Sequence, residues 1–242
     1  TRHRNTKDKF LMRTDAQKKA ITDRYESATV HKNVVNQGLI DYLLNQFNSA
    51  EHIEKNTGPV VMNYSPDRDG PQKWFTPVQR FVDNLIGESL VWGSNIYKVD
   101  YPHIVHNDDY HEKIYDIYKT VVLPLEVSKP TNFVVFDQYY LDGPVKCFRG
   151  WKDVPETYYN KSLTDYSDIV NITDEPFNKQ IYNEYLTHVP YESLHGLTVE
   201  SIVRWQPGDA ITFDMGKLHS AVDFKAQDID YKIGYSIFTA KY

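Results

Sequence analysis

Residues 206–224 read QPGDAITFDMGKLHSAVDF. A Pro-Gly turn precedes an apolar run from Ala210 to Phe213, and a short polar bend then leads to a histidine, His219. Similar short runs rich in Val, Ile, Tyr and Phe, separated by Pro, Gly, Asn and Asp, recur from about residue 90 to the end of the chain. Such runs are typical of strands, and their number predicts an all-β sandwich or barrel.

The first ninety residues have a different pattern. Apolar residues at helical spacing predict a helix over residues 35–47, and TPVQRFVDNLIGES at 76–89 predicts a second, with Thr76 as its cap and Pro77 in its first turn. Residues 176–189 predict one further helix by the same spacing. We therefore expect a basic arm at 1–30 and a single domain at 31–242. This domain would have helical support at 31–90 and a β core at 91–242, with an insertion at about 140–195.

Composition narrows the classes of function. A chain of 242 residues with 40% hydrophobic side chains can close a sizeable core, and its single cysteine, Cys147, excludes a disulfide framework or a thiolate zinc site. The net charge is -6 although residues 1–26 are basic, so the acidic body disfavours nucleic acid as a partner. We expect the basic arm to be a solvated leader rather than a docking segment. The chain has neither an apolar run long enough to span a membrane nor a secretory signal, which predicts a soluble, cytoplasmic protein.

The sequence HND contains the first candidate metal ligands, His106 and Asp108. Side chains two positions apart in an extended strand share one face, so a single strand end can present an imidazole and a carboxylate to the same ion. His219 is the candidate third ligand. Two histidines and one carboxylate with open opposite positions bind iron in non-haem Fe(II) oxygenases. Spacing alone leaves open the alternative of three unconnected residues.

With these motifs, the chain resembles 2-oxoglutarate- and Fe(II)-dependent dioxygenases, in particular the prolyl 4-hydroxylase-like and phytanoyl-CoA hydroxylase-like branches. The resemblance rests on the HxD at His106 and Asp108, the strand PGDAITFD leading to LHSA, and the strand YKIGYSIF at 231–238. It implies a mainly β fold with flanking helices around a double-stranded β-helix, the cupin-like jelly roll. It also implies Fe(II) held by His106, Asp108 and His219, with 2-oxoglutarate and O2 consumed as a substrate C–H bond is hydroxylated and succinate and CO2 form.

The resemblance further implies that Lys232 binds the far carboxylate of 2-oxoglutarate. A buried ammonium is costly unless paired, and a dicarboxylate would supply the partner. On the strand YKIGYSIF, Gly234 and Ser236 share the face of Lys232, so Gly234 leaves room and Ser236 could add a hydrogen bond. The alternative places Lys232 in solvent on an edge strand.

Some family features are replaced in this chain. Pro124 stands where related enzymes often have a tyrosine that binds 2-oxoglutarate, and the usual paired glycines before the next strand are Thr131 and Asn132. Tyr101, Tyr118 and Asn132 are candidate substitutes for these contacts.

The other histidines are expected to lie outside the metal site. His103 is an odd number of positions from His106 and should face the other way, as should Asp109. His111 begins a predicted loop, and His188 and His195, beside Pro and Gly, are expected at the surface or supporting the site.

Two other classes of function remain. One is a cupin-like metal enzyme that does not use 2-oxoglutarate, which the absence of an HxH pair disfavours. The other is a non-enzymatic jelly-roll binding module, which the intact set of three ligands disfavours. The chain has no GxxxxGK or GxGxxG loop for nucleotide binding. The expected substrate is a small molecule or a peptidyl side chain.

Overall fold

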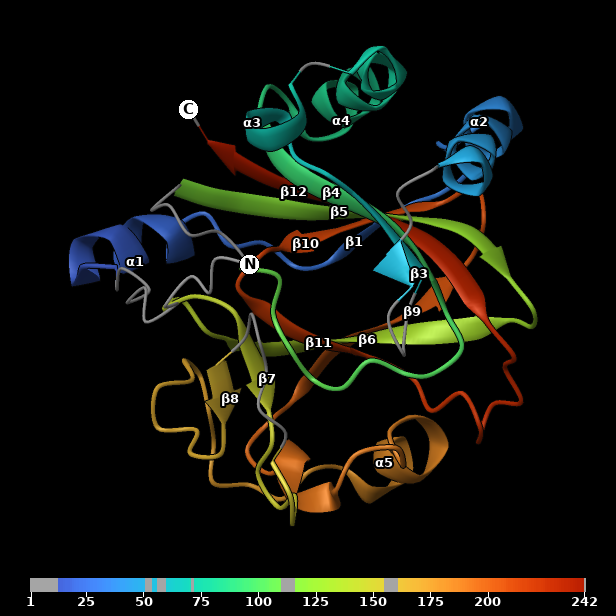
Figure 1. Ribbon diagram of the computed structural model, residues 1–242. Coiled ribbons are helices and arrows are strands. Elements are labelled where there is room, and N and C mark those ends of the chain that lie inside the picture. The colour runs from blue at the N-terminus through green and yellow to red at the C-terminus, as the bar shows by residue number, and fades with distance from the viewer. Residues whose placement is uncertain are drawn as a thin grey trace, which may run out of the picture.

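The computed structural model describes residues 13–50, 54–55, 60–70, 72–109, 116–154 and 161–241 (Figure 1). Most of the arm expected at 1–30 is therefore described, but residues 1–12 and His111 lie outside the described residues. No helix in the described ranges is long and apolar enough to cross a membrane.

Two antiparallel sheets form the core of the structure (Figure 1). In the larger, seven-stranded sheet the order is β1-β10-β5-β12-β4-β3-β2, and in the smaller it is β11-β6-β9. The larger sheet comprises β1 (Thr29–His31), β10 (Ala210–Asp214), β5 (Asp116–Val127), β12 (Lys232–Lys241), β4 (Leu90–Val99), β3 (Val60–Tyr64) and β2 (Glu54–Lys55). The smaller sheet comprises β11 (Lys217–Ala221), β6 (Thr131–Tyr139) and β9 (Val199–Trp205). Strands far apart in sequence thus alternate across both sheets, as in a jelly roll, and the predicted fold class is confirmed.

The inward faces of the two sheets meet in an apolar layer. Phe133 on β6 and Phe213 on β10 pack with ring centroids 5.6 Å apart, and Trp205 on β9 is 1% exposed beside them. Val122 and Phe133 of this layer also line a cavity between the sheets.

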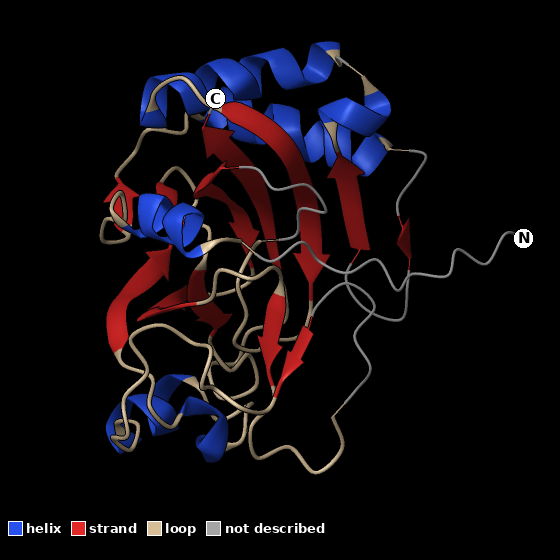
Figure 2. Ribbon diagram, turned by 90° about the vertical axis from the view of Figure 1, so that its left-hand side faces the viewer, coloured by secondary structure: helices blue, strands red, loops and turns tan. Residues whose placement is uncertain are grey.

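Two amphipathic helices cover the outer face of the larger sheet (Figure 2). Helix α2 (Gln37–Ser49) starts at Asn36, whose side chain accepts a hydrogen bond from the Leu39 backbone, and it buries Leu43 against the sheet. Helix α4 (Thr76–Ile86) buries Val78 in the same cluster. Both predicted helices are present, but Thr76 is the first helical residue rather than the cap. Helix α3 (Pro66–Asp69) and the short helix η1 (Lys73–Phe75) complete this layer.

The segment between β6 and β9 forms the other end of the molecule (Figure 1). It holds the parallel strands β7 (Val145–Cys147) and β8 (Lys161–Leu163), the helix η2 (Tyr191–Leu194) and helix α5 (Lys179–Tyr185). Helix α5 is the one predicted at 176–189, and it is shorter because Asn178 caps its start.

The basic N-terminal segment is docked on the core, so the expectation of a solvated leader is wrong for residues 13–24. Helix α1 (Asp15–Thr22) begins with a capping box between Thr14 and Gln17. Basic side chains around the helix then pair with carboxylates on the core: Arg13 with Asp109, Lys18 with Asp142, and Arg24 with Asp116. The charge pattern of the arm alone could not show these partners, because they lie about a hundred residues away in the sequence.

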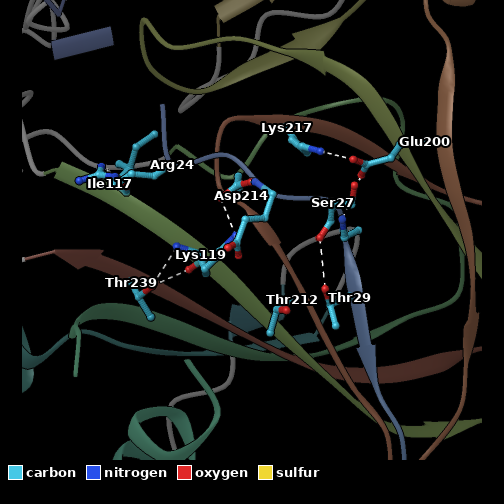
Figure 3. Close-up of polar contacts among 12 residues, drawn as sticks. Arg24, Ser27, Thr29, Ile117, Lys119, Glu200, Thr212, Asp214, Lys217 and Thr239 are labelled. Carbon is cyan, nitrogen blue, oxygen red and sulfur yellow. Dashed lines mark hydrogen bonds and ion pairs between the residues drawn. The ribbon is translucent and has the colours of Figure 1, made fainter. Parts of the chain in front are cut away.

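Buried ion pairs also tie the strands next to this segment (Figure 3). Lys119 Nζ on β5 lies 2.8 Å from an oxygen of Asp214 on β10, and Lys217 on β11 pairs with Glu200 on β9. Burial raises the pKa of Asp214, and its other oxygen accepts a hydrogen bond of 2.7 Å from the Glu26 backbone. These contacts tie β10 to β5 and β11 to β9, and β11 is the strand that carries His219.

Candidate metal centre

The backbone brings His106 and His219 side by side. His106 lies outside the named strands but forms an isolated antiparallel bridge with His219 on β11. The His106 backbone N–H donates to the His219 carbonyl at 3.0 Å, and the His219 N–H donates to the His106 carbonyl at 2.8 Å. The ring centroids are consequently 4.2 Å apart.

Asp108 joins the two imidazoles. One oxygen of its carboxylate is 3.8 Å from His106 Nε2, and the other is 3.5 Å from His219 Nε2. The candidate ligand atoms of the three residues lie within 4.8 Å of one another, and all three residues are buried. Thr120 on β5 donates a hydrogen bond of 3.1 Å to Asp108 Oδ2, which fixes the carboxylate plane.

The ring nitrogens have the arrangement that a metal requires. His106 Nδ1 is 2.7 Å from the Ile104 carbonyl and His219 Nδ1 is 3.1 Å from the Lys217 carbonyl, so each Nδ1–H can donate to the backbone. The Nε2 lone pairs then face Asp108. Burial lowers the pKa of His106 well below its usual value and favours the neutral imidazole that binds metal. The three residues therefore fit a divalent transition metal such as Fe(II).

His103 lies on the metal side, contrary to prediction. Its ring centroid is 4.3 Å from that of His106, and the two Nδ1 atoms are 3.3 Å apart. The prediction assumed strand alternation, but residues 101–105 are not in a strand. His188 lies behind the site, with Nε2 3.5 Å from Ser220 Oγ.

A cavity of about 180 Å³ extends from the three ligands between the two sheets. Most of its wall is apolar, from side chains such as Val122, Phe133 and Ala221. Its polar lining includes Asn95 and Tyr97 on β4 and Lys232 and Ser236 on β12.

Lys232 is buried in this cavity, which excludes the solvent-facing alternative. Lys232 is 5% exposed, and its Nζ lies 4.2 Å from the Trp205 ring centroid and 5.7 Å from the Phe224 ring centroid. Among the described residues no carboxylate forms an ion pair with it. Burial lowers its pKa from 10.5 to about 7. Such an ammonium provides a site for an anionic ligand.

Further polar groups line the cavity or lie beside the Trp205 ring. The hydroxyl groups of Tyr97 and Ser236 both line the cavity, and burial raises the pKa of Tyr97. Trp205 Nε1 and Thr131 Oγ1 are buried without a hydrogen-bond partner in the described structure, and these two residues pair across β9 and β6. A Cβ on Gly234 would lie 2.6 Å from the Trp205 ring and 2.7 Å from the Tyr97 hydroxyl. The Trp205 and Tyr97 side chains can therefore occupy their positions only because residue 234 is glycine.

The structure does not bring Tyr101, Tyr118 or Asn132 to the cavity wall. Tyr101 is 39% exposed beyond β4, and the Tyr118 ring lies beneath Lys241 at the far end of β5. Asn132 falls between inward-facing positions of β6, so alternation turns it outward.

Tyr97 lines the cavity instead, although it was not among the predicted site residues. The same alternation applied to the predicted strand NIYKVDY would have placed Asn95, Tyr97 and Val99 on one face.

Comparison with family models found no match, and comparison with curated proteins found none either. Solved structures similar to the chain include the non-haem α-ketoglutarate-dependent epimerase SnoN from nogalamycin biosynthesis. It is 14% identical with a TM-score of 0.48, and the match covers 93% of this chain and 83% of SnoN. A Pseudomonas putida prolyl-4-hydroxylase is 7% identical with a TM-score of 0.47, covering 93% and 99%. A 2OG-Fe(II) oxygenase family member from Burkholderia pseudomallei is 10% identical with a TM-score of 0.48, covering 96% and 94%.

Proposed function

We propose that the protein is an Fe(II)- and 2-oxoglutarate-dependent oxygenase that hydroxylates a C–H bond of a small-molecule or peptidyl substrate. The observation that carries the proposal is the presence of two complementary features in one buried cavity. One is the His106–Asp108–His219 triad, and the other is the ammonium of Lys232, which pairs with no carboxylate in the described part of the chain.

The triad would hold iron through two Nε2 atoms and one carboxylate. Thr120 orients Asp108, and backbone carbonyls orient both imidazoles, so the ligands are positioned before the metal arrives. Fe(II) with 2-oxoglutarate and O2 supplies the oxidising chemistry, in which one oxygen atom enters succinate, one enters the product and CO2 is released.

Lys232 would bind the far carboxylate of 2-oxoglutarate. A charge-assisted hydrogen bond there would offset the desolvation of both groups. The hydroxyl groups of Tyr97 and Ser236 line the same cavity and can complete the solvation of that carboxylate. The apolar wall excludes water from the reacting atoms.

Anaerobic titration with Fe(II) and then 2-oxoglutarate tests the proposal. We expect a weak visible charge-transfer band that is lost in His219→Ala and weakened in Lys232→Ala. In air, substrate-dependent succinate formation and incorporation of labelled O2 into the product, measured by mass spectrometry, would distinguish hydroxylation from other oxidations. The absence of the band in the wild-type protein would refute the proposal.

A further inference from the structure

The loop that carries His106 and Asp108 is anchored from its outer side. His106 and Asp108 point to the cavity, whereas Asn107 and Asp109 point away from it. The Asn107 amide donates to the carbonyls of Tyr140 at 3.0 Å and Gly143 at 3.1 Å. Asn107 Oδ1 in turn accepts a hydrogen bond of 2.9 Å from the Val145 backbone. Asn107 thus ties the ligand loop to the segment that follows β6.

Arg13 makes the second anchor, from the N-terminal segment. Both terminal nitrogens of its guanidinium donate to Asp109, with Nη2 3.1 Å from Oδ1, and Nη1 also donates to the Leu141 carbonyl. The side chains of Arg13 and Asp109 are 5% and 0% exposed. One planar cation therefore joins three parts of the chain: the ligand loop, the segment after β6 and the entry to α1.

This contact has consequences for the metal ligand next to it. Asp109 follows Asp108 directly, so the position of its carboxylate limits the backbone freedom of Asp108. If Arg13 were absent, Asp109 would be a buried carboxylate without its cation. It would then take up a proton or move toward water together with the backbone that also carries Asp108, and in either case the loop would lose this anchor. Residues that orient metal ligands in this indirect way commonly set metal affinity.

We propose that Arg13 is a positioning residue of the metal centre and that the docked N-terminal segment is part of that centre. The inference rests on the proposed function, because it requires a metal at the triad. Removal or displacement of the segment around α1 would then lower metal affinity while the cavity side chains stay unchanged. The pair between Lys18 and Asp142 also docks the segment on the core, and the capping box stabilises the start of α1 directly after Arg13.

Metal affinity of the full chain tests the proposal. Co(II) or, without oxygen, Fe(II) is titrated against a chromogenic chelator, and the thermal unfolding temperature of the metal-free protein is measured in parallel. We expect Arg13→Met to weaken metal binding by about tenfold or more. The matched control is Arg24→Met, which removes the ion pair with Asp116 from the same segment but touches neither ligand loop nor Leu141. The dissociation constant of Arg24→Met for the metal should stay within about twofold of the wild-type value, a change of less than about 1 kcal/mol in binding free energy.

A double variant separates positioning from general stability. Arg13→Met with Asp109→Leu replaces the buried ion pair by apolar groups, which often restores stability. We expect this variant to recover its unfolding temperature but to keep the weakened metal affinity, and it serves as the test if Arg13→Met alone does not fold. Wild-type metal affinity in the double variant, or in a folded Arg13→Met, would overturn the proposal. If the wild-type protein and His219→Ala fail equally to bind metal, the proposed function is at fault instead.

Discussion

The buried ammonium of Lys232 leads to a prediction about stability that requires neither metal nor substrate. Its pKa is lowered from 10.5 to about 7 by burial, so the unfolded chain binds the proton more tightly than the folded protein does. The buried charge therefore lowers the free energy of unfolding, and this loss has its full size below about pH 7. The loss becomes smaller as the pH rises from about 7 toward 10.5. The difference between the two pKa values corresponds to about 5 kcal/mol at low pH. Lys232→Met, which keeps the stem and removes the charge, should therefore stabilise the metal-free protein.

Urea unfolding at pH 6 and pH 9 measures this effect. We expect Lys232→Met to exceed wild type by several kcal/mol at pH 6 and by clearly less at pH 9. Lys98→Met on the neighbouring strand β4 is the control, because Lys98 is exposed and its removal should leave the pH dependence unchanged. A stability difference between wild type and Lys232→Met that is equal at the two pH values, or a less stable Lys232→Met, would show that Lys232 does not hold an uncompensated charge.

Three further predictions concern the cavity and the core. Gly234→Ala should destabilise the fold by about 1–3 kcal/mol and weaken 2-oxoglutarate binding, because the added Cβ would overlap the Trp205 ring. Thermal unfolding measures the loss of stability, and Gly93→Ala is the control because its Cβ would lie 3.8 Å from the nearest atoms. The dissociation constant for 2-oxoglutarate, measured by calorimetry on the metal-loaded protein without oxygen, should rise by up to about tenfold per pH unit above 7 as Lys232 loses its proton, and Lys232→Arg should abolish that rise. Leu43→Ala in α2 should cost about 2–5 kcal/mol in urea unfolding with unchanged metal affinity, because Leu43 is 0% exposed and remote from the cavity.

Features that repeat with the period of a strand or helix could be predicted from the sequence. Alternation placed Lys232 and Ser236 on one face, and the structure has both lining the cavity. The helical spacing of residues 35–47 and 76–89 predicted α2 and α4 in the same way. Each of these predictions depends only on neighbours within one element.

Contacts between distant segments could not be predicted in this way. Alternation failed for His103 because no strand runs through residues 101–105, so its direction is set by the turn that leads to His106. The docking of Arg13 on Asp109 depends on the fold bringing two segments together, and net charge alone favoured a solvated arm. Alternation also predicts the face of a residue but not its position along the strand. Tyr118 lies near the start of β5, beneath Lys241, and does not reach the cavity.

The charges of the cavity predict an order of binding. Without metal, the negative charge of Asp108 and the positive charge of Lys232 sum to zero in the cavity, although the two groups form no ion pair. A dicarboxylate entering this buried space would therefore add two uncompensated negative charges. A bound divalent cation reverses this, because the cavity then carries two excess positive charges that 2-oxoglutarate neutralises. We therefore expect calorimetry to show strong 2-oxoglutarate binding only to Fe(II)- or Co(II)-loaded protein without oxygen, and little binding to metal-free protein. Equal affinity in the two forms would mean that Lys232, rather than the charge of the metal, dominates the recognition of the co-substrate.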